Sequence, residues 1–141
     1  MLTRVSAEHA RERTEAVMLQ GSNLHVIHQV FTNAGDHQLI SLLDSCLKIL
    51  QASTAINRTL GSDNSESGFV AILRNKLHHP IPHARVSLLR TLNVMCSKHD
   101  DPSHFLKENN LLKVVRFMAQ NDLSNLVKNM AVALLKEGGK S

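Results

Sequence analysis

His83-Ala-Arg-Val-Ser-Leu-Leu-Arg-Thr-Leu-Asn-Val-Met-Cys96 is the segment from which the architecture of this 141-residue chain can be inferred. Its apolar residues recur at spacings of three and four, and they are Ala84, Leu88, Leu89, Leu92 and Met95. This spacing places them on one wide face of a helix. Val86, Val94 and Cys96 extend the apolar surface further round. A helix that is apolar over so much of its surface needs neighbours on several sides, so the segment predicts a core helix.

The same pattern occurs in two other parts of the chain. Leu43, Leu88 and Met130 occupy corresponding positions, and so do Leu47, Leu92 and Leu134, which sets the copies 45 and 42 residues apart. A second apolar position lies 19 residues before the first of these in every copy, at Leu24, Phe69 and Leu111. In each copy, two predicted helices are shifted by the same number of residues. This agreement indicates an internal repeat rather than chance similarity. We therefore predict a helical repeat with periods of 45 and 42 residues.

The repeat predicts an all-α fold in which about three units stack into an α-solenoid, forming one domain over residues 1–141. We expect the units at about residues 5–53, 54–98 and 99–137, with a short, a medium and a long helix in the last of them (Pro102–Asn109, Asn110–Gln120 and Leu123–Glu137). This period resembles armadillo and HEAT repeats. The Leu92-Asn93-Val94 step is similar to the Leu-Asn-Leu step of the long armadillo helix, but Lys48 and Leu135 replace the asparagine in the other copies. The choice between armadillo and HEAT therefore stays open.

Several breaks separate the predicted helices. The Ser- and Gly-rich run at 61–68 predicts a flexible loop within the middle unit. Pro82 and Pro102 follow turn-forming residues, so each is expected at the start of a helix. Residues 5–20 predict a further helix, with Ser6 as its cap.

Composition narrows the class of protein. Only 3% of the residues are aromatic, so aliphatic side chains must build the core, which favours helix packing over sheets. The formal charge of +4 is spread along the chain without a Lys/Arg run, so we expect neither nucleic-acid binding nor a membrane patch. No apolar run approaches the roughly 18 residues of a membrane span. Cys46 and Cys96 lie in apolar helical patterns and predict buried, reduced thiols, which fit an intracellular compartment.

The sequence offers no convincing catalytic or metal-binding motif. His78, His79 and His83 are clustered, but no Cys or carboxylate completes a zinc site with them. Gly138-Gly-Lys-Ser141 resembles the end of a phosphate-binding loop, but Leu134 stands where that loop needs glycine, so we expect a frayed C-terminus. We therefore predict no metal, no cofactor and no catalysis by this chain.

Polar residues on the long helices are the candidate binding residues. In a stacked-helix architecture they line a shallow groove that can hold a peptide or protein. The candidates are Ser41, Ser45 and Lys48 in the first unit, Arg90 and Asn93 in the second, and Lys128 and Asn129 in the third. The alternative is that these residues form only the solvated side of amphipathic helices.

Three segments in the second half of the chain carry a family resemblance. They are Ala84-Arg-Val-Ser-Leu-Leu-Arg-Thr-Leu92, Phe105-Leu-Lys-Glu-Asn-Asn-Leu-Leu112 and Leu126-Val-Lys-Asn-Met-Ala-Val-Ala-Leu-Leu-Lys136. Together they resemble the C-terminal armadillo-like end of the MAP-kinase-kinase-kinase epsilon family, which includes the kinase of the fungal septation-initiation network. Residues 1–83 share the resemblance only through the repeat.

This resemblance implies a non-catalytic segment of a Ser/Thr protein kinase, because the glycine-rich loop, His-Arg-Asp and Asp-Phe-Gly motifs of a kinase domain are absent from the chain. It also implies a cytoplasmic protein, recruited to the spindle pole body and acting in septation and cytokinesis below a small Ras-like GTPase. Docking to that GTPase or to a scaffold is the first functional hypothesis. Self-association of the kinase as a homodimer is the alternative.

Overall fold

The structure is a computed structural model that describes residues 29–61 and 68–139. Within these ranges the chain contains helices and turns but no strand, which confirms the all-α prediction. The long helices are α3 (Asp36–Ala52), α6 (Pro82–Ser97) and α9 (Asn125–Gly139). The shorter elements are α4 (Thr54–Gly61), α5 (Phe69–Asn75), the 3-10 turn η1 (Lys76–His78), α7 (Pro102–Glu108) and α8 (Leu112–Asn121). The predicted helix over 5–20, its cap Ser6 and most of the predicted loop at 61–68 lie outside the described residues.

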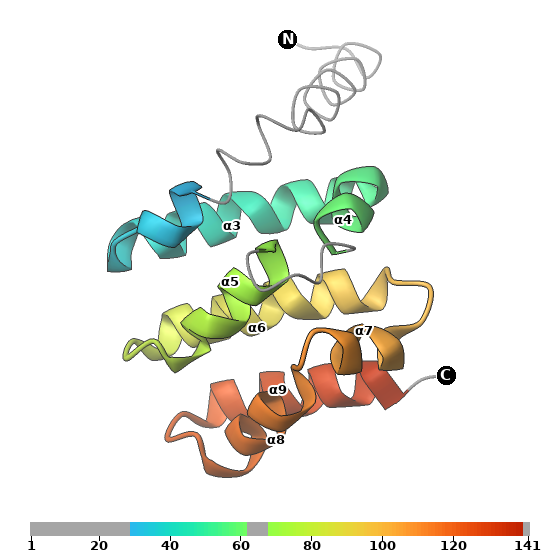
Figure 1. The fold of residues 1–141 in the computed structure, drawn as a ribbon. Helices are drawn as coiled ribbons and strands as arrows, with labels where there is room; N and C mark the ends of the chain where they lie inside the picture. Colours follow the sequence, from blue (N-terminus) through green and yellow to red (C-terminus); the bar gives the residue numbers. More distant parts are fainter. Residues whose placement is uncertain (1–28, 62–67, 140–141) are drawn as a thin grey trace, which may run out of the picture.

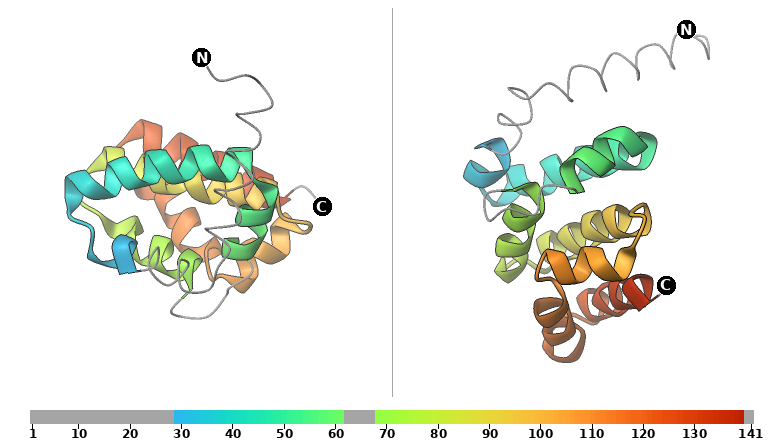
Figure 2. Two further views of the ribbon diagram at one scale, coloured as in Figure 1. Left: turned by 90° about the horizontal axis from the view of Figure 1, so that it is seen from above. Right: turned by 45° about the vertical axis from the view of Figure 1, so that its right-hand side comes forward.

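The three long helices lie side by side in the order in which they occur in the sequence (Figure 1). Helix α6 is in the middle and contacts both α3 and α9. The shorter helices lie in front of this row in Figure 1, and the right-hand view of Figure 2 shows the same separation from another side. The row of long helices therefore has one side that the shorter helices cover and an opposite side that they leave open.

The predicted apolar face of α6 is at the centre of the core. The five residues that define this face are each at most 1% exposed: Ala84, Leu88, Leu89, Leu92 and Met95. Cys96 and Val86 are also buried, and Val94 is half-buried. The aromatic residues Phe31 and Phe69 meet edge to face, with ring centroids 5.2 Å apart. The prediction of a core helix with neighbours on several sides is confirmed.

Helix starts follow the predicted proline positions. Pro82 is the first residue of α6 and Pro102 the first residue of α7, where a missing backbone N–H costs nothing. Asp101 precedes α7, and its Oδ1 accepts a hydrogen bond from the His104 backbone N–H at 3.1 Å. The prediction of a frayed C-terminus is wrong for Gly138 and Gly139, because α9 continues to Gly139 and Gly138 is buried against Leu106 of α7; the rest of that segment, residues 140–141, lies outside the described residues.

The turn between α7 and α8 corrects a second boundary. We expected the medium helix to begin at Asn110, but it begins at Leu112. Asn110 has a φ of 57°, in the left-handed region, and is not helical. Its backbone N–H donates to the Lys107 carbonyl at 3.2 Å, and the Leu111 N–H donates to the Leu106 carbonyl at 2.9 Å. This pair of bonds is the Schellman motif that ends a helix, and asparagine tolerates the left-handed position better than most residues.

Replacing Asn110 with alanine should lower the free energy of unfolding by about 1 kcal/mol, because a Cβ without a compensating polar group is strained at this φ. Replacing it with glycine should leave stability unchanged or raise it slightly. Urea denaturation followed by circular dichroism would measure both variants. An alanine variant as stable as the glycine variant would contradict the assigned backbone conformation.

Lys98 links the ends of α3 and α6. Its Nζ donates to the Leu50 carbonyl at 2.9 Å and to the Gln51 carbonyl at 2.7 Å. These carbonyls belong to the last turn of α3, where no further helical N–H is available to them. The ammonium therefore caps α3 from the connection that follows α6 and holds the two helices in register.

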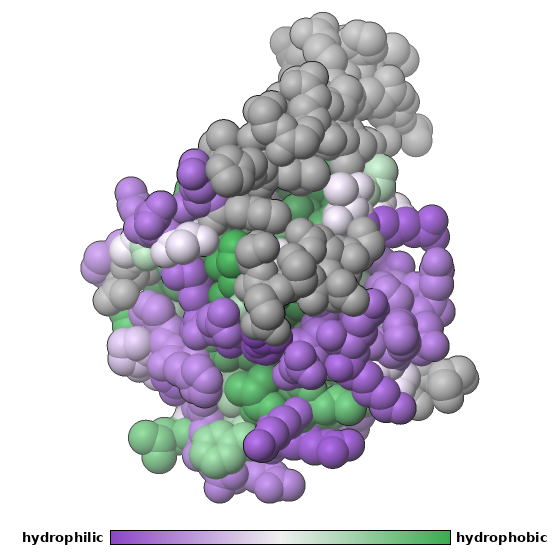
Figure 3. All heavy atoms as spheres, in the orientation of Figure 1, coloured by the Kyte–Doolittle hydropathy of each residue, from purple (hydrophilic) through white to green (hydrophobic). Residues whose placement is uncertain are grey.

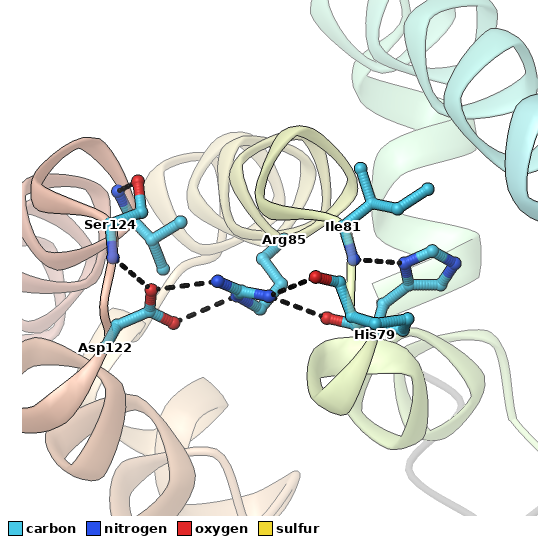
Figure 4. Close-up of polar contacts among 7 residues, drawn as sticks. His79, Ile81, Arg85, Asp122 and Ser124 are labelled. Carbon is cyan, nitrogen blue, oxygen red and sulfur yellow. Dashed lines mark hydrogen bonds and ion pairs between the residues drawn. The ribbon is translucent and has the colours of Figure 1, made fainter.

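Arg85 and Asp122 link the middle and last parts of the structure (Figure 4). The Arg85 guanidinium donates from Nε and Nη2 to the two carboxylate oxygens of Asp122 at 3.0 and 3.1 Å. Its Nη1 donates to the carbonyls of His79 and Pro80 at 2.8 and 3.1 Å. The Ser124 backbone N–H donates to the same carboxylate at 2.9 Å. One side chain at the start of α6 thus holds both the η1–α6 turn and the α8–α9 turn.

The pKa of Asp122 is held below its usual range. Burial of the carboxyl would by itself raise the pKa, but hydrogen bonds from Arg85 and Ser124 and the positive charges of Arg85 and Lys128 outweigh that effect. A depressed pKa in the folded state means that the carboxylate stabilises the fold above the unfolded pKa of about 4. This contribution is lost as the pH falls through the folded value.

We expect the free energy of unfolding to fall as the pH drops below about 4, and part of this fall should disappear in Asp122→Asn. Urea denaturation curves at a series of pH values would measure both proteins. Identical acid dependence in the two proteins would show that Asp122 does not titrate with folding.

Candidate protein-interaction surface

The seven predicted binding residues all lie on the long helices. Ser41, Ser45 and Lys48 are on α3, Arg90 and Asn93 on α6, and Lys128 and Asn129 on α9. Five of them are exposed, whereas Asn93 and Lys128 are half-buried. Some of them occupy equivalent repeat positions on neighbouring helices and others do not. Only residues at equivalent exposed positions can form one continuous surface.

The repeat offsets align two rows of residues across the neighbouring long helices. Ser45, Arg90 and Val132 correspond, and all three are exposed, Val132 by 37%. Lys48 and Asn93 also correspond, and the row continues to the half-buried Leu135. Because α3, α6 and α9 are adjacent in this order, the repeat offsets predict that each row runs across the three helices.

Lys128 and Asn129 fit these rows less well. The α6 residue that corresponds to Lys128 is Val86, which is only 6% exposed, so a row through Lys128 is interrupted by an apolar residue. Asn129 corresponds to Ser87, which is 5% exposed. Lys128 and Asn129 therefore both lie outside the rows, and so does Ser41, whose α6 counterpart is also Val86. We use the term open face for Ser45, Lys48, Arg90, Asn93 and Val132.

Asn93 has an unusual polar environment. Its Oδ1 atom is buried and accepts no hydrogen bond from any described residue. A buried acceptor without a donor costs about 1–3 kcal/mol, so native proteins rarely keep one without a reason. Because this oxygen is buried, a partner on the surface of α6 would not reach it. The charge of the open face comes from the exposed Lys48 and Arg90.

The two thiols are not available as nucleophiles. Cys46 and Cys96 are free and buried, as predicted. Burial raises the pKa of each thiol to about 12, and the charge of Glu137 adds to the effect at Cys96. At neutral pH both are therefore protonated thiols, and the thiolate is the reactive form.

Other polar groups do not converge on a site. Among residues 29–61 and 68–139, no group of three His, Cys, Asp or Glu side chains is arranged to hold a metal ion. No described helix is by itself long and apolar enough to cross a membrane; α3 and α4 together have the length and composition, but the chain bends by 119° between them.

A hollow on α8 was not predicted from the sequence. It has a volume of about 820 Å³ and is lined by residues of α8, the α7–α8 turn and η1, Phe117 among them. Phe117 is 65% exposed. The repeat gives the equivalent positions to Val30 and Asn75, so an exposed aromatic residue here could have been noticed as a departure from the pattern.

Comparison with known proteins finds similarity to plant protein kinases. The chain is 28% identical over 137 residues to MAP3K epsilon protein kinase 2 of Arabidopsis thaliana, an alignment that covers 92% of the chain. It is 24% identical over 139 residues to MAP3K epsilon protein kinase 1 of Brassica napus, covering 94% of the chain. The similarity to this kinase type therefore extends well into residues 1–83. The chain spans about a tenth of the length of these relatives. No protein-family model and no solved structure matches the chain.

Proposed function

We propose that this chain is a non-catalytic docking region of a protein kinase of the MAP3K epsilon type, built as an armadillo- or HEAT-like stack that binds another protein on its open face. The relatives are kinases, yet the chain aligns with only 10% of their length. It contains none of the kinase sequence motifs. A helical stack with an exposed polar row suits recognition of a partner rather than chemistry.

The exposure of Ser45, Arg90 and Val132 at corresponding positions of three adjacent long helices is the observation that carries the proposal. An extended segment of a partner could lie across α3, α6 and α9 and contact these side chains. Lys48 and Arg90 are exposed on the neighbouring helices α3 and α6 and would pair with carboxylates of that segment. The two cations therefore favour an acidic partner.

The proposed partner is a small Ras-like GTPase or a scaffold that recruits the kinase. In a fungal septation kinase this role would place the chain in the cytoplasm and at the spindle pole body, in cytokinesis signalling. Both partner and location follow from the family resemblance. The open face supplies the contact residues.

Calorimetry with the Ras-like GTPase, loaded in turn with a GTP analogue and with GDP, tests the proposal. Micromolar or tighter binding of the GTP form alone, weakened about tenfold or more by Arg90→Glu, would support it. Lys107→Glu on α7 is the matched charge control, because that lysine is exposed and lies on a shorter helix, away from the open face. The absence of heat with either nucleotide form would exclude the GTPase and leave the scaffold as the proposed partner.

Self-association is a second candidate, favoured by apolar exposure at the end of the stack. Leu123 is 99% exposed and Leu126 on α9 is 57% exposed. Leu126 corresponds to Ala84 of α6 and Leu39 of α3, which are buried. Analytical ultracentrifugation would detect a dimer, and Leu126→Asp should weaken it whereas Val132→Asp, on another side of the same helix, should not. A monomer at every concentration would exclude this candidate.

A further inference from the structure

The hollow on α8 combines an exposed aromatic side chain with positive charge. Phe117 forms part of its wall together with the half-buried Leu112 and Val114. In Figure 3, apolar side chains lie among hydrophilic ones at the end of the molecule formed by α8 and α9. Phe117 is 65% exposed, and covering it with a partner is favourable because apolar surface is removed from water. Aromatic residues of this kind often supply much of the binding energy at protein interfaces.

All of the charge around the hollow is positive. Lys113 and Arg116 line it and are both exposed, and no Asp or Glu is among its lining residues. Acidic groups elsewhere in this region have other partners, since Asp122 binds Arg85 and Glu108 lies 3.3 Å from His104. The hollow is therefore electrostatically complementary to a carboxylate-bearing partner.

The repeat does not require these residues. The position of Lys113 is held by Ala71 in the preceding copy, where it is 4% exposed, and that of Phe117 is held by the polar Asn75. In the first copy the position of Phe117 is held by Val30, which is 43% exposed, so the aromatic ring but not the exposed apolar character is specific to α8. Packing of the stack does not explain Lys113 and Phe117, because both side chains are exposed.

We propose that the α8 hollow is a docking site for an acidic protein segment that carries one bulky apolar side chain. The apolar side chain packs on Phe117, Leu112 and Val114, and carboxylates on either side of it pair with Lys113 and Arg116. This site is independent of the open face, because it lies on a shorter helix in front of the row of long helices (Figure 1). It can therefore hold its ligand whether or not the docking function proposed for the open face is correct.

Selection of peptides from a random displayed library against the full 141-residue chain tests this proposal without assuming a partner. We expect the selected peptides to be rich in Asp and Glu around a Leu, Phe or Trp. Phe117→Ala should weaken their binding at least about tenfold, as expected for an interface hot spot. The double variant Lys113→Glu/Arg116→Glu should do the same and should lose the sensitivity of binding to salt. Arg90→Glu, on the open face, is the matched charge control and should bind normally.

Thermal melts would establish that each variant is folded, which is expected because the replaced side chains are all exposed. A second selection against the Lys113→Glu/Arg116→Glu variant should lose the acidic preference. The proposal is overturned if no peptide is enriched, if the enriched peptides lack acidic residues, or if Phe117→Ala leaves their affinity unchanged. Loss of binding in Arg90→Glu but not in Phe117→Ala would also overturn it and would place the ligand on the open face.

Discussion

Replacing Arg85 with methionine should lower the free energy of unfolding by about 3–5 kcal/mol, the range found when one member of a buried ion pair is removed. The side chains of Arg85 and Asp122 are only 13% and 8% exposed. Methionine would leave the Asp122 carboxylate in this environment without its cation. It would also leave the carbonyls of His79 and Pro80 without the donor that now joins the two turns. Chemical denaturation followed by circular dichroism would measure the loss.

Two further variants identify the cause of the loss. Arg58→Met breaks the Arg58–Asp100 pair, whose side chains are 63% and 85% exposed, so it should cost no more than about 1 kcal/mol. Arg85→Met combined with Asp122→Leu removes both charges and should be less destabilised than Arg85→Met alone, because no unpaired carboxylate remains. If the double variant were the less stable of the two, the hydrogen bond that Asp122 accepts from the Ser124 N–H would outweigh the cost of the unpaired carboxylate.

The Arg85–Asp122 ion pair is a contact that the repeat pattern does not predict. The residues that correspond to Arg85 are Ile40 and Val127, so the other copies contain no such arginine. Apolar spacing correctly predicted the buried face of α6, because burial of such a face depends on periodicity alone. An ion pair between residues 37 positions apart depends on how two turns meet, and no local pattern records that.

The open face was partly predictable for the same reason. Ser45 and Arg90 are exposed on adjacent helices, as their polarity and the repeat offset suggested. Lys128 and Asn129 were placed with them because they are polar, but their counterparts on α6, Val86 and Ser87, are buried. Polarity alone therefore does not define a helix face at the end of a stack. The missing partner of Asn93 Oδ1 could not be foreseen, since it depends on the positions of donors in neighbouring helices.

Leu92→Ala should be among the most damaging truncations at the repeat positions, lowering the free energy of unfolding by about 2–5 kcal/mol. Leu92 is 0% exposed and lies on α6, which contacts long helices on both sides. Removing its isobutyl group leaves a cavity that close-packed neighbours cannot easily fill. Urea denaturation would give the difference between the variant and the parent chain.

The matched control is Leu47→Ala, because the repeat places the same residue type at the same position of α3. Leu47 is only half-buried, so its truncation removes less buried apolar surface and should cost about 1–2 kcal/mol. Leu134→Ala on α9 should resemble Leu92→Ala, since Leu134 is also 0% exposed although α9 is the last of the three long helices. Equal losses at Leu47 and Leu92 would mean that position in the repeat sets the energetic cost. A larger loss at Leu92 and Leu134 would mean that the neighbouring helices set it.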